Sequence, residues 1–242
     1  MAMRAPPLLF PAAAKHTATV IFLHGLGDTG YGWASAVENW RRRQRLDEVK
    51  FILPHAPRIS VTAAGGMPMP GWYDIFALSG KIEDIRRNQD ERGILQSREY
   101  LNGLIQEEID SGIPSNRIVL GGFSQGAAMS LFTGLTAKVK FAGIVALSGY
   151  LPLDTKLEEL LQENDHNRET PILMCHGDED EVVPTQLGKM SYELLKNHGF
   201  DATMKIYPGL PHSACIEELD EVESFLRARL PPQDGKKTEL QN

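Results

Sequence analysis

The stretch that decides the fold is RIVLGGFSQGAAMSLFTGL, residues Arg117–Leu135. An apolar run typical of a buried strand passes through a glycine-rich turn into a second apolar run with helical character. The turn carries the pattern G-x-S-x-G over Gly122–Gly126, with Ser124 at its centre. A nucleophile elbow needs this strand–turn–helix context, and its tight turn needs very small neighbours. The pattern therefore predicts a nucleophilic Ser124; the alternative is a serine that only caps the helix.

Strand-like and amphipathic runs alternate along the rest of the chain. The strand-like runs are near-continuously apolar, as in strands buried on both faces of a parallel sheet. These runs are Ala18–Leu23, Lys50–Leu53, Arg117–Gly121, Phe141–Leu147, Pro171–Cys175 and Ala202–Tyr207. Apolar residues from Ile94 to Ile109, and from Ile216 to Leu230, recur on one helical face. The alternation predicts an α/β fold with a mostly parallel central sheet and helices on both faces.

Length and composition are those of an ordinary globular protein. The chain has 242 residues, of which 42% are hydrophobic and 24% charged, enough for one sizeable core. We expect a single domain over 1–242, with its core over about 17–231 and a mobile polar tail over 232–242. The balance of 25 basic against 32 acidic residues gives a net charge of −7. Such a charge repels nucleic acid, so a nucleic-acid partner is not expected.

Cysteine usage and the N-terminus bear on location. Two cysteines, Cys175 and Cys215, are too few for a disulfide framework, and free thiols suit a reducing compartment. The run Pro6–Ala14 has some features of a signal peptide, but it contains prolines and leads directly into a predicted core strand. No apolar run approaches the ~18 residues that span a bilayer. We expect a cytoplasmic protein, with the nucleus as a second location, that has no signal peptide and no transmembrane segment.

The serine needs a base and an acid. Of seven histidines, His198 and His212 follow an acid-rich loop. His198 ends a helical run, where a cation is ordinary, whereas His212 stands in YPGLPHSAC between the last strand and the last helix. Catalytic groups project from such loops, so His212 is the predicted base. The acid should come from GDEDE, Gly177–Glu181, where spacing leaves Asp178 and Asp180 equal.

An oxyanion intermediate needs two backbone N–H donors. One should belong to Gln125, the residue after the nucleophile, and the other to a loop near the first core strand. FLHGLGD, Phe22–Asp28, is a glycine-rich turn in that place, and it offers the N–H of Leu26. The turn is otherwise a simple connector or a phosphate loop. It lacks both G-x-G-x-x-G and G-K-S/T, so nucleotide binding is not expected.

Two further stretches allow more than one interpretation. Thr62–Gly80 is too broken by proline and glycine for a regular element, yet it is rich in large apolar side chains. It is either a loop packed on the core or the wall of a binding groove. The arginines of Arg41–Arg45 are either the solvated end of a helix, balanced by Asp47 and Glu48, or a docking patch for anionic membrane.

Six motifs in one order resemble a known family. They are LHGLGDTGYGW (Leu23–Trp33), LPHAP (Leu53–Pro57), GWYDI (Gly71–Ile75), GIPSNRIVLGGFSQGAAMSL (Gly112–Leu131), CHGDEDEVVP (Cys175–Pro184) and GLPHSAC (Gly209–Cys215). Together they closely resemble the acyl-protein thioesterase/lysophospholipase family of small carboxylesterases, over nearly the whole chain. The resemblance implies an α/β-hydrolase fold and a serine hydrolase of acyl thioesters or esters.

The resemblance also implies roles for individual residues. It implies the triad Ser124, Asp180 and His212, with Leu26 and Gln125 as oxyanion donors. It implies an acyl channel lined by residues on two loops, namely Trp72, Ile75, Phe76, Leu78, Val182 and Val183. It implies neither a cofactor nor a metal. The family usually has proline after the aspartate, where this chain has Glu181, which puts the rigidity of that loop in question.

The implied function is hydrolysis of palmitoyl-type thioesters on protein cysteines. Lysophospholipase or general carboxylesterase activity uses the same machinery, since all three reactions pass through the same oxyanion. A rival of another class is an inactive lipid-binding module on the same fold. The expected partners are S-acylated proteins or acyl lipids, with transient contact to a membrane surface through an apolar loop or weak electrostatics. The oligomeric state stays open between a monomer and a weak homodimer.

Overall fold

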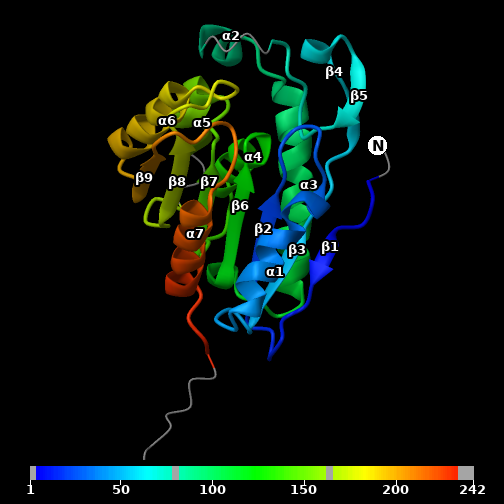
Figure 1. Ribbon diagram of the computed structural model, residues 1–242, viewed down its shortest axis with the longest axis vertical. Coiled ribbons are helices and arrows are strands. Elements are labelled where there is room, and N and C mark those ends of the chain that lie inside the picture. Colours follow the sequence, from blue (N-terminus) through cyan, green and yellow to red (C-terminus); the bar gives the residue numbers. More distant parts are fainter. Residues whose placement is uncertain (1–3, 78–81, 162–165, 234–242) are drawn as a thin grey trace, which may run out of the picture.

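The computed structural model describes residues 4–77, 82–161 and 166–233. Its centre is a seven-stranded sheet in the order β1-β3-β2-β6-β7-β8-β9 (Figure 1). The strands are β1 (Leu8–Phe10), β2 (Ala18–Leu23), β3 (Val49–Leu53), β6 (Ile118–Phe123), β7 (Gly143–Leu147), β8 (Ile172–Gly177) and β9 (Ala202–Tyr207). β1 pairs antiparallel with β3, and the other neighbours in this sheet are parallel. The prediction of a mostly parallel sheet is confirmed.

Helices cover both faces of the sheet, as predicted. They are α1 (Ala34–Arg42), α2 (Ile82–Arg87), α3 (Glu91–Asp110), α4 (Gln125–Leu135), α5 (Leu157–Leu161), α6 (Thr185–Asn197) and α7 (Ile216–Arg229), with 3₁₀ turns at Gly30–Trp33, Thr62–Ala64, Ser115–Arg117 and Asp154–Lys156. Val20 and Phe22 of β2 pack with α1 and α7, while Ile21 and Leu23 pack with α3 and α4. Successive strand residues point to opposite faces, so an apolar pair on each face explains the unbroken apolar runs.

Three features differ from the sequence-based expectations. The short strand β1 was not foreseen. Thr62–Gly80 was expected to hold no regular element, but β5 (Met67–Pro70) pairs with β4 (Arg58–Val61) in a separate antiparallel ribbon. Proline is tolerated there because a two-stranded ribbon has free edges that need no further N–H donors. Ile216 was expected on a buried face, yet it is 70% exposed at the first position of α7.

The arginine cluster is held largely by the chain itself. Arg41 donates a hydrogen bond to the carbonyl of Pro11, 2.9 Å away. Arg43 forms ion pairs with Asp220 and Glu223 of α7, at 2.6 and 2.5 Å. The carboxylate partners of Arg43 are therefore on α7. The sequence had suggested Asp47 and Glu48, in the turn that follows the helix. These contacts favour a structural role for the cluster.

The described residues contain two free cysteines and no helix that could span a membrane. Within residues 4–77, 82–161 and 166–233, no helix is both long and apolar enough to cross a membrane. Cys175 is buried, Cys215 is partly buried, and both are free thiols, as the sequence predicted. The same ranges hold no group of three or more His, Cys, Asp or Glu side chains arranged to bind a metal ion.

Candidate active site

Ser124 stands on a strained turn between β6 and α4. Its φ of 54° and ψ of −120° lie in a backbone region that residues other than glycine rarely adopt. A Cβ at Gly122 would lie 2.5 Å from the carbonyl carbon of Gly126, and a Cβ at Gly126 would lie 2.2 Å from the Leu23 oxygen. Both positions therefore require glycine. The elbow presents the Ser124 side chain at the carboxyl end of a central strand, where ligand sites of α/β sheets lie.

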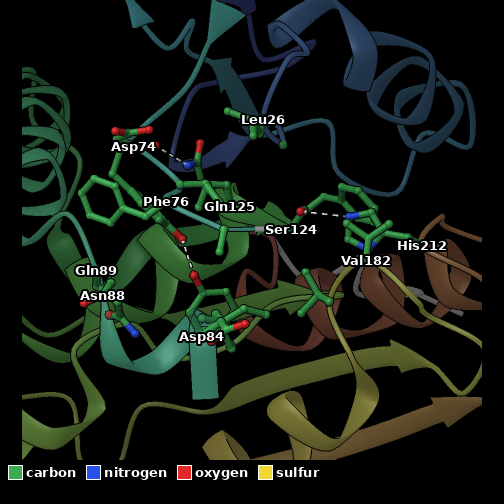
Figure 2. Close-up of a pocket in the computed structure, with 18 of the residues that line it drawn as sticks. Leu26, Asp74, Phe76, Asp84, Asn88, Gln89, Ser124, Gln125, Val182 and His212 are labelled. Atoms are coloured by element: carbon green, nitrogen blue, oxygen red, sulfur yellow. Dashed lines mark hydrogen bonds between the residues drawn. The ribbon is translucent and has the colours of Figure 1, made fainter. Parts of the chain in front are cut away.

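Three side chains distant in sequence meet at this turn. The Ser124 Oγ lies 2.9 Å from His212 Nε2, the contact drawn as a dashed line in Figure 2. His212 Nδ1 lies 2.7 Å from Asp180 Oδ2. An ionised carboxylate only accepts hydrogen bonds, so Nδ1 carries the proton and Nε2 accepts from the serine. This arrangement lets His212 remove the Ser124 proton, while Asp180 fixes the tautomer.

The Asp180 carboxylate is buried but fully hydrogen-bonded. Its Oδ1 accepts from the backbone N–H groups of Val182 and Val183, at 3.0 and 2.8 Å. Burial alone raises the pKa of Asp180, but bonds from His176, His212 and the Val183 N–H outweigh it and hold that pKa well below its ordinary value. The acid therefore stays ionised. Glu181, where the family usually has proline, does not prevent this backbone cradle.

His176 is a neighbour of the acid that sequence reasoning missed. Its Nε2 lies 2.8 Å from the Val183 carbonyl oxygen and 3.3 Å from Asp180 Oδ2. Both are acceptors, so Nε2 carries a proton shared between them. The ring is 1% exposed. The sequence did contain a signal for His176, namely its position at the carboxyl end of the predicted strand before the acid loop.

The rival histidine and aspartate have other contacts. His198 caps α6, with its Nδ1 2.8 Å from the Leu194 carbonyl. The Oδ1 of Asp178 accepts from the N–H of Gly209 at 2.6 Å, so this carboxylate ties the acid loop to the loop that carries His212. Spacing did not separate Asp178 from Asp180, whereas the structure places only Asp180, of these two, against the imidazole.

Two backbone donors lie beside Ser124. Gln125 is the first residue of α4, and the first N–H groups of a helix have no intrahelical acceptor. Leu26 comes directly after Gly25, and Gly25 lies so close to the elbow that a Cβ on it would be 3.3 Å from Ser124 Cβ. Within the described chain, neither the Leu26 N–H nor the Gln125 N–H has a backbone or side-chain acceptor. Both stay available to an oxyanion.

A mainly apolar pocket of about 270 Å³ opens beside the serine. Eight of the predicted residues line it, and they come from five separate segments of the chain. They are Leu26, Ile75, Phe76, Ser124, Gln125, Val182, Val183 and His212. Figure 2 shows Ser124 with His212 on one side and Gln125 on the other. Leu78 falls outside the described residues.

Trp72 is a correction, because it does not line this pocket. Its side chain is 2% exposed and packs between His24 and Tyr100, with ring centroids at 5.2 and 6.5 Å. The chain turns inward at Trp72 before it returns to the pocket at Tyr73. A large apolar residue in a broken stretch looks alike whether it faces a groove or the core, so sequence alone did not separate the two.

The pocket also contains residues that were not foreseen. Tyr73 and Tyr150 both line it, and their hydroxyl oxygens lie 3.1 Å apart. Burial raises the pKa of both phenols, so both stay neutral. The short helix α2 adds Asp84 and Ile85 to the lining, and Asn88 and Gln89 follow just beyond its end. Figure 2 shows Asp84, Asn88 and Gln89 on the side of the pocket away from Leu26.

Comparisons with known proteins cover the whole region that carries this site. A family model described as Phospholipase/Carboxylesterase matches residues 8–230. Acyl-protein thioesterase 1 of Neurospora crassa is 66% identical over 228 residues, which cover 94% of this chain and 93% of that protein. Acyl-protein thioesterase 1 of Gibberella zeae is 59% identical over 231 residues, or 96% and 98% of the two chains. The crystal structure of Zea mays acyl-protein thioesterase 2 is similar with a TM-score of 0.82 and 32% identity, over 93% of this chain and 98% of that one.

Proposed function

The chain belongs to the phospholipase/carboxylesterase family, and from that premise we propose that it hydrolyses S-acyl thioesters on protein cysteines, with Ser124 as nucleophile. The observation that carries the proposal is the hydrogen-bonded series from Ser124 Oγ to His212 at 2.9 Å and from His212 to Asp180 at 2.7 Å. A serine hydroxyl is a weak nucleophile without such a base. Beside it lies an apolar pocket suited to an acyl chain.

The reaction follows from these positions in two halves. His212 Nε2 takes the Ser124 proton while the Oγ attacks the acyl carbon, and the N–H groups of Leu26 and Gln125 stabilise the oxyanion. The carbon–sulfur bond breaks, and His212 returns its proton to the leaving thiolate. Water then attacks the acyl-enzyme, with His212 again as base, and releases the fatty acid and free Ser124. Asp180 stabilises the imidazolium in each half and keeps its own charge.

The leaving group favours thioesters. A cysteine thiol with a pKa near ~8.5 leaves far more readily than an alcohol, so the site needs little help from His212 as an acid. The names of the relatives support the same substrate class, since the Neurospora crassa protein is 66% identical and is called acyl-protein thioesterase 1. Lysophospholipid and short-ester hydrolysis remain the alternative activities of the same serine. An inactive lipid-binding module is the alternative of another class.

A turnover panel tests the proposal. We expect kcat/KM to be highest for a palmitoylated peptide thioester, lower for a lysophospholipid and lowest for a short unactivated ester. Ser124→Ala should lower turnover by ~10⁴–10⁶, as triad removal does in other serine hydrolases, and leave the fold intact. Hydrolysis of the peptide thioester by folded Ser124→Ala at the wild-type rate would contradict the proposal. A wild type that binds the peptide without turnover would favour the inactive module.

Finer properties belong to the same proposal. Phe76 and Val182 line the pocket and are 42% and 50% exposed, which suits transient contact with the membrane that holds an acylated substrate. A cytoplasmic or nuclear location is proposed because two free thiols suit a reducing compartment.

A further inference from the structure

We infer that Trp72 is a positioning residue, which ties together the two backbone segments that donate to the oxyanion. The inference rests on the proposed function, because donation to the oxyanion by the N–H groups of Leu26 and Gln125 is part of that proposal. It replaces the sequence-based expectation that Trp72 contacts the acyl chain. The contacts of Trp72 on each of its two sides support it.

The first side is the nucleophile elbow. The Gln125 side chain is buried, and its Oε1 accepts the backbone N–H of Trp72 at 2.8 Å. The same carboxamide donates through Nε2 to the Tyr73 carbonyl at 2.7 Å. Two bonds from one planar amide fix both its distance and its orientation. Because α4 begins at Gln125, they also fix the peptide whose N–H donates to the oxyanion in the proposed reaction.

The second side is the turn that carries Leu26. The Trp72 indole Nε1 donates to the carbonyl of His24 at 2.8 Å. The His24 ring is fully buried, accepts the N–H of Ala56 at Nε2 (3.0 Å) and lies 2.7 Å through Nδ1 from the Gly25 carbonyl. The Gly25 carbonyl belongs to the same peptide unit as the Leu26 N–H. The indole therefore anchors the segment immediately before the second donor.

Trp72 is itself held firmly. Its carbonyl accepts a 2.5 Å bond from the Ser97 hydroxyl of α3, and its ring stacks on Tyr100 of the same helix. With 2% of its surface exposed, it has no freedom to follow a substrate. An oxyanion site must be held to within about 0.5 Å of the productive geometry, so a buried support of this kind determines how well both donors act.

Trp72→Phe tests the inference, because it removes the indole N–H and keeps an aromatic ring. Loss of one oxyanion donor costs ~10²–10³ in kcat, and a shifted donor should cost about tenfold. We expect kcat to fall about tenfold with KM unchanged, equally for acetyl and palmitoyl thioesters. Affinity for a trifluoromethyl ketone, whose adduct places an oxyanion in the same site, should fall by the same factor.

Trp40→Phe is the matched control. Trp40 is 1% exposed, and its indole donates to the Leu219 carbonyl at 3.1 Å, on the opposite face of the sheet from Trp72. The same atoms are lost at the same depth, so both variants should lose similar stability. Only Trp72→Phe should lose kcat and inhibitor affinity. Equal kinetic losses in the two variants, or a Trp72→Phe defect confined to KM for the long chain, would overturn the inference.

Gln125→Met provides a second route to the same test if Trp72→Phe does not fold. The thioether has a similar length but neither donates to the Tyr73 carbonyl nor replaces the amide oxygen that accepts from Trp72 N–H, so we expect the same fall in kcat and inhibitor affinity. Normal values for both would overturn the inference. Failure of the proposed function is recognised separately, since the wild type would then neither turn over thioester nor form the ketone adduct.

Discussion

Asp180, in the loop after β8, and Glu218, in α7, are two buried carboxylates whose surroundings are opposite. Asp180 accepts hydrogen bonds from two backbone N–H groups and from His212. Glu218 is fully buried, and neither of its carboxylate oxygens has a hydrogen-bond partner among the described residues. Hydrogen bonds hold the pKa of Asp180 well below its ordinary value, against the effect of burial, whereas burial raises the pKa of Glu218 to about 8.

The difference shows that burial by itself does not determine charge. A buried carboxylate keeps its charge where donors surround it and gives it up where they are missing. The lowered pKa of Asp180 favours the ionised form that its proposed role requires, whereas the raised pKa of Glu218 favours the neutral form in the core near Cys175 and Tyr207. Three substitutions separate the two roles.

The largest effect is expected at Asp180. Asp180→Asn keeps the shape but loses the charge that selects the His212 tautomer, so kcat should fall by ~10⁴. Circular dichroism should show an intact fold. Asp178→Asn is the matched control, since its carboxylate contacts Gly209 and not His212; its kcat should fall by less than about tenfold. Similar losses of kcat in the two variants would contradict the proposed role of Asp180 as the acid of the triad.

A smaller effect is expected at His176, whose loss makes Asp180 more like Glu218. His176→Phe keeps a buried ring but removes the donor 3.3 Å from Asp180 Oδ2. The pKa of Asp180 should then rise toward its ordinary value, and kcat should fall by about tenfold, as expected for a displaced supporting group. Because a depressed carboxylate pKa adds stability that is lost as pH falls, the thermal stability of the variant should fall less steeply than that of the wild type as the pH is lowered below about 4. Parallel pH dependences, with thermal stability lowered equally at every pH, would mean that His176 only fills space.

The smallest kinetic effect is expected at Glu218. Its pKa is raised on folding from 4.5 to about 8, so between these values the native state binds the extra proton. The contribution of Glu218 to stability is therefore complete below about pH 4.5 and is lost as pH rises to about 8, with a slope of at most ~1.4 kcal/mol per pH unit.

Glu218→Gln cannot ionise, so its melting temperature should fall less between pH 6 and pH 9 than that of the wild type. Thermal unfolding of both proteins across this range measures the difference. We expect kcat at neutral pH to stay within about twofold of the wild type. Parallel melting curves would show that Glu218 is not protonated in the native state.

Sequence reasoning found the features that are written locally. The glycines around Ser124 and the apolar strand before it belong to one short stretch, so the elbow could be predicted directly. The sheet and its covering helices followed from the apolar periodicity. His212 was predictable from its loop, but Asp178 and Asp180 differ only in which way a tight turn directs them, and the family resemblance was needed to choose.

Features that depend on side-chain direction were missed. Trp72 and Phe76 lie in one broken apolar stretch, yet Trp72 is 2% exposed and Phe76 is 42% exposed. Hydrophobic periodicity and composition do not predict that difference, because the stretch has no regular repeat. The pairing of Tyr73 with Tyr150 joins residues 77 positions apart, so it arises only when the fold assembles. His176 and Asp180 are four residues apart, and their contact depends on the direction that the turn after β8 gives each side chain.

The most direct measurement of the central claim is the mass of the protein during turnover. The enzyme is mixed with a palmitoylated peptide thioester, quenched in acid within the first turnovers, and analysed intact and after proteolysis. The account predicts one added acyl group that maps to Ser124, is absent in Ser124→Ala and disappears as free fatty acid forms. An acyl group on Cys175 or Cys215, or steady hydrolysis by Ser124→Ala, would contradict it.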